Sequence, residues 1–209
     1  MSEQSPLSLG TEDIKKLLMR YAVPAIVAMT AASLYNMMDS IFIGHGVGAL
    51  GIAGLAVTFP FINLAAAFGS LVGVGASTLV SVKMGQKDLK SAEAVLGNVL
   101  LLNTVIGFLF MTVCLIFLDP ILYFFGASAD TLPYARDYMN VILIGNVITH
   151  MYLGLNAVLR SSGFPKLAMY ATLASVVINC VLNPLFIFGF GWGIKGSAWA
   201  TVISQVISL

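Results

Sequence analysis

One carboxylate interrupts a long apolar stretch of this sequence. Asp39 is the only Asp, Glu, Lys or Arg between Tyr21 and Val82. An Asp at the centre of a membrane-spanning helix costs roughly 2.5–3.5 kcal/mol, so such residues face a protein interior or cavity and mark ion or proton paths. Tyr35 and Asn36 precede Asp39 by four and three residues, which predicts one shared helical face. We interpret Asp39 as a cation-binding residue supported by Tyr35 and Asn36, with an interhelical hydrogen bond as the alternative.

Two other apolar runs carry oxygen-bearing side chains at helical spacing. Asn179 and Asn183 are four residues apart, and Pro184 follows directly. Because proline has no amide hydrogen, it frees a backbone carbonyl one turn earlier. The second run consists of Ser197, Thr201 and Gln205. Each run alone is more typical of hydrogen bonding between helices, but together with one buried carboxylate they could supply the oxygen ligands that a hard cation takes.

Other kinds of chemistry have little support in the sequence. It contains no G-x-S-x-G, Walker A or H-E-x-x-H motif, so no enzymatic activity or cofactor is expected. His150 has no companion His or Cys at ligand spacing, and we predict no metal role for it. Cys114 and Cys180 both lie in apolar runs, and no disulfide between them is expected.

The composition identifies the environment of the chain. Its 209 residues are 59% hydrophobic and only 9% charged, whereas a soluble domain carries about 25% charged residues. Such a chain cannot cover a water-facing surface, so the bilayer is its main solvent and nucleic acid is not an expected partner. The apolar runs are too long for strands and lack their alternation. We therefore predict an all-α polytopic membrane protein.

A bilayer core of about 30 Å needs about 20 apolar residues for each helical crossing. Spans are predicted near residues 14–43, 52–82, 92–118, 132–159, 167–188 and 194–209, the last one incomplete. Turns or loops rich in Gly or charge separate them at residues 44–51, 83–93, 119–133, 160–166 and 189–196. The polar leader holds both acids and bases, and it is not expected to be a cleavable signal. Because the last run has no helix stop before Leu209, we expect a fragment of a longer protein.

The basic residues predict an orientation. Eight of the ten fall on one side of the predicted membrane: Lys15, Lys16, Arg20, Lys83, Lys87, Lys90, Arg160 and Lys166. Only Arg136 and Lys195 fall on the other side. The positive-inside rule places the larger group, and with it the N-terminus, in the cytoplasm.

Four stretches of the sequence resemble one transporter family. They are Pro24 followed by Asp39 and IFIGHGVG, then GVGASTLVSVKMGQKDLKSAEAVLG, then LRSSGFPKLAM, and finally NCVLNPLFIFGFGWGIKGSAWATVISQ. In this order and spacing the chain resembles the N-terminal six-helix half of the multidrug and toxic compound extrusion (MATE) transporters, and bacterial members most closely. The resemblance covers nearly the whole chain from about Leu17.

The resemblance implies a twelve-helix protein of two six-helix lobes around a central cavity, of which the C-terminal lobe is missing here. It implies export of small cationic or amphiphilic compounds across the bacterial cytoplasmic membrane by alternating access, driven by inward flow of Na⁺ or H⁺. The family's cation site matches Asp39, Asn179 and Thr201 here. A fourth family position is often Asp in an N-x-x-x-D-P pattern, but this chain has Asn183. A neutral amide still offers an oxygen to Na⁺ but cannot be a second proton site.

Pro24 removes a backbone hydrogen bond within the first span and permits a kink. The resemblance implies that Pro24 is a hinge, and a static kink is the alternative. Two other functions remain open for the whole chain. A lipid-linked oligosaccharide flippase of the same superfamily would share six-helix lobes, although it typically buries more Arg and Lys. A membrane scaffold or subunit would not transport at all, and Asp39 would then have only a packing role.

Overall fold

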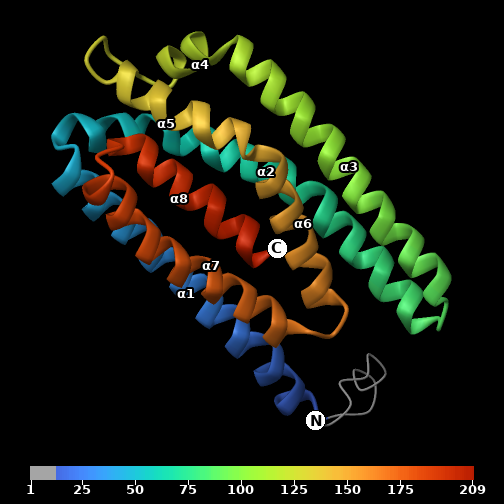
Figure 1. Ribbon diagram of the computed structural model, residues 1–209. Helices are drawn as coiled ribbons and strands as arrows, with labels where there is room; N and C mark the ends of the chain where they lie inside the picture. The colour runs from blue at the N-terminus through green and yellow to red at the C-terminus, as the bar shows by residue number, and fades with distance from the viewer. Residues whose placement is uncertain (1–12) are drawn as a thin grey trace.

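The protein is described by a computed structural model of residues 13–209, which are helical with no strand among them (Figure 1). This confirms the predicted all-α architecture. The polar leader, for which no cleavable signal is expected, lies mainly in residues 1–12, outside the described range.

Four of the predicted spans are long helices. They are α1 (Ile14–Gly46), α2 (Ala49–Gly85), α3 (Leu89–Ile116) and α7 (Pro165–Pro184), the last continued by the π-helical turn η2 (Leu185–Gly189). Within residues 13–209 these four are long and apolar enough to cross a bilayer. α8 (Gly193–Ser208) has 16 residues, fewer than the about 20 that a crossing needs.

The ends of these helices follow local rules. The Asp13 carboxylate accepts a hydrogen bond from the Lys15 amide at the start of α1. Asp88 caps α3 in the same way through the Ser91 amide, at 3.1 Å. Hydrogen bonding from the side chain and the backbone of Ser91 lowers the pKa of the Asp88 carboxyl below its ordinary value. Between α1 and α2, Gly48 has a φ of 94°, which glycine adopts at little cost.

The predicted fourth span consists of two helices and not of one continuous helix. α5 (Leu132–Ile144) and α6 (Asn146–Ser161) meet at Gly145 with a bend of 58°. Gly145 has ψ −4°, far from the about −42° of a regular helix. A Cβ on Gly145 would lie 2.4 Å from the Val202 side chain, so α8 packs directly against the bend.

The predicted loop at residues 119–133 also needs correction. It contains a short helix, α4 (Leu118–Phe124). Leu118 and Leu122 are one turn apart and both are buried in the main hydrophobic core. Pro120 falls in the first turn, where its missing amide hydrogen costs no helical bond. The apolar anchors therefore outweigh the turn-forming residues in this segment.

The helices pack as two groups along one bundle axis. α1 lies beside α7, and α2 lies between α3 and α6 (Figure 1). α8 packs against α5 and α7 and joins the two groups. Between α2 and α6 the His150 side chain is fully buried, and its Nε2 donates to the Ala65 carbonyl at 3.0 Å. This arrangement brings α1, α7 and α8 together around Asp39.

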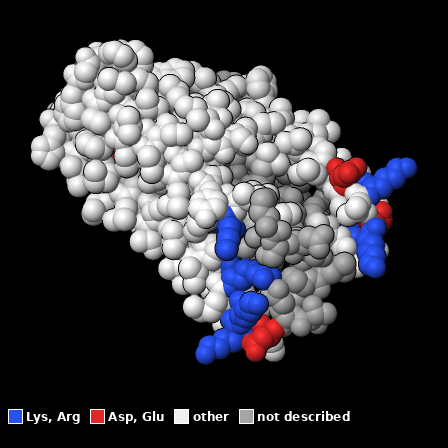
Figure 2. Space-filling view, turned by 60° about the horizontal axis from the view of Figure 1, so that its bottom comes forward, with Lys and Arg blue, Asp and Glu red and all other residues white. Residues whose placement is uncertain are grey.

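The charged residues gather at the two ends of the bundle. The eight bases of the predicted cytoplasmic side belong to the start of α1, the α2–α3 turn and the α6–α7 turn, which all lie at the lower right of Figure 1. In Figure 2 the visible Lys and Arg atoms gather at one end, and almost all of the rest of the described surface that faces the viewer is uncharged. At the other end, Arg136 pairs with Asp119, and Lys195 with Asp137 at 3.1 Å.

Candidate cation site

The Asp39 side chain lies at the meeting point of three helices. It is only 5% exposed, and it points from α1 toward α7 and α8. Asn183 Nδ2 on α7 donates to Asp39 Oδ1 at 2.8 Å. Ser197 Oγ on α8 donates to the same oxygen in a short hydrogen bond. The carboxylate is therefore held by polar groups from helices that are far apart in the sequence.

A chain of hydrogen bonds continues from Asn183 to α1. Asn183 Nδ2 also donates to Asn179 Oδ1 at 3.0 Å, and Asn179 Nδ2 donates to Thr201 Oγ1 at 3.3 Å. Thr201 uses its own hydrogen on the Ser197 carbonyl, at 3.1 Å. The Tyr35 hydroxyl, 2.7 Å from Thr201 Oγ1, must then be the donor in that pair. Each hydrogen bond of this network therefore has a defined donor and a defined acceptor.

Two oxygens in the site accept no hydrogen bond from the described residues. Asn183 Oδ1 is buried and has no hydrogen-bond partner there. No hydrogen bond to Asp39 Oδ2 occurs among residues 13–209. A buried oxygen such as Asn183 Oδ1 normally finds a partner. The carboxylate, the two amide oxygens and the hydroxyls form an all-oxygen donor set, which suits a hard cation such as Na⁺. A proton on the carboxylate would equally remove its unpaired charge.

Local sequence explains how the site is built. The four-residue spacing of Asn179 and Asn183 brings both amides to the buried face of α7. Pro184 ends the regular hydrogen-bond pattern, and η2 follows at once. π-Helical turns inside helices occur frequently at functional sites.

On α1, Asp39 lies seven residues before Gly46, about 10 Å from the helix end. The site is therefore closer to the end opposite the eight bases.

Two of the predicted supporting residues do not join this network. Asn36 is exposed. At about 100° per residue, Tyr35 lies about 40° to one side of Asp39 and Asn36 about 60° to the other, so only Tyr35 turns toward α8. Gln205 instead accepts a hydrogen bond from Thr149 Oγ1 of α6, at 2.6 Å. Pro24 is buried in α1, about four turns away from Asp39.

The sequence interpretation also missed two residues of the site. Ser197 was recognised only as part of a polar run, although it donates directly to Asp39. Tyr138 of α5 is buried near Thr201 and lies within electrostatic reach of Asp39 and Tyr35. Only Tyr134 accompanies Tyr138 at helical spacing, and no Asp, Asn, Ser or Thr lies three or four residues away to indicate this position.

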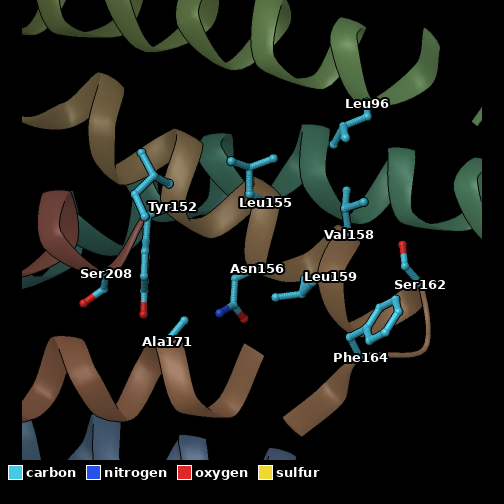
Figure 3. Close-up of a pocket in the computed structure, with 11 residues that line it drawn as sticks. Leu96, Tyr152, Leu155, Asn156, Val158, Leu159, Ser162, Phe164, Ala171 and Ser208 are labelled. Atoms are coloured by element: carbon cyan, nitrogen blue, oxygen red, sulfur yellow. The ribbon is translucent and has the colours of Figure 1, made fainter. Parts of the chain in front are cut away.

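A pocket between α6, α7 and the end of α8 is separate from this network. It has a volume of about 360 Å³ and is mainly apolar (Figure 3). Tyr152 and Asn156 of α6 line it together with Ser208 of α8. Asn156 Nδ2 donates to the Ala168 carbonyl at 3.1 Å, which ties α6 to α7. None of the residues bonded to Asp39 lines the pocket, so it is not part of the cation site.

Comparison with known proteins gives the family. The MatE family model matches residues 24–185, more than half of the chain. The chain belongs to the MatE family. A curated relative in this family is the multidrug export protein MepA of Staphylococcus haemolyticus (strain JCSC1435), which is 28% identical over 208 residues. That alignment covers 100% of this chain and 46% of MepA. MepA of Staphylococcus aureus (strain MRSA252) is 29% identical over 191 residues.

Solved MatE-family structures share the fold. A MATE structure described as the bent conformation has a TM-score of 0.89 at 30% identity, and it covers 97% of this chain and 45% of that protein. An outward-facing multidrug resistance MATE transporter has a TM-score of 0.88 at 30% identity, with 94% and 44% covered. The chain thus spans about half the length of the MatE-family proteins that it matches.

Proposed function

We propose that this chain is the N-terminal lobe of a cation-coupled antiporter in the bacterial cytoplasmic membrane. The complete protein exports small cationic or amphiphilic compounds by alternating access, in exchange for Na⁺ or H⁺. The coupling cation binds at Asp39, with Asn179, Asn183 and Thr201 as oxygen ligands or supports. The similarity to proteins named multidrug export protein supports the export of drugs.

The observation that carries this proposal is the state of Asp39. It is the only buried carboxylate among residues 13–209, and no Lys, Arg or His is among its bonded partners. A buried charge without a counter-charge is costly. A cation that binds removes this cost, and release of the cation restores it. The site can therefore change the relative stability of two transporter conformations, which is what coupling requires.

The proposed orientation follows from the charges at the bundle ends. The end with eight bases faces the cytoplasm under the positive-inside rule. The cation site then lies in the outer half of the membrane, close to the side from which an inward-moving cation arrives. A second lobe supplies the other wall of the substrate cavity.

Replacement of Asp39 tests the proposal. Asp39→Asn keeps the shape and one oxygen but can neither take a proton nor carry charge, so we expect efflux to lose its dependence on both gradients. The measurement is efflux of a cationic dye from vesicles that contain the two-lobe protein, under an imposed Na⁺ gradient or an imposed pH gradient. Asn183→Ala removes one neutral ligand and should weaken coupling less.

A matched control uses the same substitution at the end of the bundle, away from the cation site. Asp137→Asn removes an exposed carboxylate that pairs with Lys195, and we expect wild-type efflux from it. Wild-type efflux by Asp39→Asn under both gradients would refute the coupling role and leave Asp39 a packing residue.

A further inference from the structure

Two donors converge on one oxygen of Asp39. Asn183 Nδ2 and Ser197 Oγ both donate to Oδ1, whereas no donor among the described residues reaches Oδ2. Both hydrogens of the Asn183 amide are used, one on Asp39 and one on Asn179. The amide therefore has a fixed orientation, and its buried Oδ1 has no hydrogen-bond partner among residues 13–209. One oxygen of the carboxylate is held, and the other remains available together with Asn183 Oδ1.

We propose that Ser197 is a positioning residue that sets the ion preference of this site in favour of Na⁺ over H⁺. Its hydroxyl holds Asp39 Oδ1 and thereby leaves Asp39 Oδ2 and Asn183 Oδ1 available to the coupling cation. The inference rests on the proposed function, because it concerns the choice of ion at the same carboxylate.

The preference follows from what each ion does to the carboxylate. Na⁺ leaves the carboxylate ionised, so Oδ1 still accepts two charge-assisted hydrogen bonds. A proton makes the group neutral, and hydrogen bonds to a neutral acceptor are roughly half as strong. A donor to the charged form favours that form. The Ser197 bond therefore stabilises the Na⁺-bound site more than the protonated site.

Few other groups around Asp39 could stabilise its ionised form. The titratable groups facing it are Tyr35 on α1, Tyr138 on α5 and Cys180 on α7, and none of them carries a positive charge. On α8 the only titratable residue is Lys195, which pairs with Asp137 at the end of the bundle. The hydrogen-bond donors are thus the groups that stabilise the ionised carboxylate in the described chain.

Water cannot easily replace the Ser197 hydroxyl. Ser197 is 0% exposed, and its backbone carbonyl is occupied by Thr201 Oγ1. Its bond to Asp39 also joins α8 to α1 across 158 positions of sequence. Loss of the hydroxyl would leave Asn183 as the only donor to Asp39 in the part of the chain that the structure describes.

The test compares ion dependence in Ser197 variants of the two-lobe protein in vesicles. The readout is the ratio of cationic-dye efflux driven by a Na⁺ gradient to efflux driven by a pH gradient of equal size. A hydrogen bond to a charged group is worth enough that Ser197→Ala should lower this ratio about tenfold. Ser197→Thr keeps the hydroxyl and should retain most of the ratio. Ser197→Cys keeps the volume with a weak S–H donor, and it should lower the ratio in the same direction.

Ser204 provides a matched control on the same helix. Its hydroxyl is buried and donates to the Thr201 carbonyl at 2.8 Å, without a bond to Asp39. Ser204→Ala should leave the ratio unchanged, which separates ion choice from a general effect on α8.

The outcomes distinguish this inference from the proposed function. An unchanged ratio in Ser197→Ala and Ser197→Cys would overturn the role of Ser197, and so would a wild-type protein that responds to the pH gradient alone. If Asp39→Asn still abolishes coupling in those cases, the proposed function stands. Undiminished efflux by Asp39→Asn would instead remove the proposed function itself.

Discussion

Gly73 lies where α2 and α6 touch backbone to backbone. A Cβ on Gly73 would lie 2.5 Å from Gly154 Cα and 3.0 Å from the Gly154 carbonyl oxygen. Backbone atoms cannot rotate away as the end of a side chain can. To reach an ordinary contact of 3.4 Å from 2.5 Å, Gly73→Ala must separate the two helices locally by about 0.9 Å.

This separation has an estimable cost. Overpacking a well-packed interface costs typically about 1–3 kcal/mol, and the better helix propensity of Ala offsets up to about 1 kcal/mol of it. We therefore expect Gly73→Ala to destabilise the protein by about 1–2 kcal/mol. For a chain of this length 1 kcal/mol corresponds to about 2–4 °C in Tm, so the expected loss is on the order of 5 °C.

Gly75 is a matched control, two residues further along α2. A Cβ on Gly75 would meet nothing within 4 Å, so Gly75→Ala should leave Tm unchanged or slightly higher. The assay is the thermal loss of the folded size-exclusion peak of the protein purified in detergent. If Gly73→Ala and Gly75→Ala had the same Tm, the close α2–α6 packing described above would be refuted.

Two further predictions concern topology and motion. The first uses a protein in which Cys114 and Cys180 are replaced by Ser. In it, Lys87→Cys should resist an impermeant thiol reagent added outside intact cells, whereas Ala129→Cys at the opposite end of the bundle should react. Labelling at position 87 would reverse the proposed orientation. Pro24→Ala should slow dye efflux by the two-lobe protein more than it weakens dye binding, because it restores a hydrogen bond that a hinge must lack; an unchanged efflux rate would argue for a static kink.

The long helices were predictable because their signal is local. Apolar runs longer than 20 residues predict membrane-spanning helices without further information. The observed ends of α1, α2 and α3 fall within three residues of the predicted ones. The bend at Gly145 depends instead on contact with Val202, 57 positions later, which hydropathy cannot report. α4 is likewise stabilised by burial of Leu118 and Leu122 in the core.

The cation site shows the same limit. Asp39 was conspicuous because a charge is rare in an apolar run, and helical spacing paired Asn179 with Asn183. The bonds that join Asp39 to Asn183 and Ser197 cross 144 and 158 positions of sequence. Spacing alone could not show that Ser197 reaches Asp39 or that Asn36 turns away from it, because both depend on which neighbour each helix face meets.

The amide at position 183 has a consequence for the energy available to transport. With Asn183 in place of a second acid, Asp39 is the one charge in the site, and one Na⁺ or one proton neutralises it. The Asn183 amide gives both hydrogens to neighbours, and because an amide does not ionise it offers only a neutral oxygen to the cation. On the proposed function, each cycle at this site therefore moves one cation, which gains about 2.3 kcal/mol for each 100 mV of membrane potential. Since 1.4 kcal/mol is a factor of ten, one charge crossing 100 mV sustains roughly a fiftyfold concentration ratio of an uncharged substrate. A cationic substrate carries its own charge outward against the same potential, so for such substrates the concentration gradient of the coupling ion must supply the driving force.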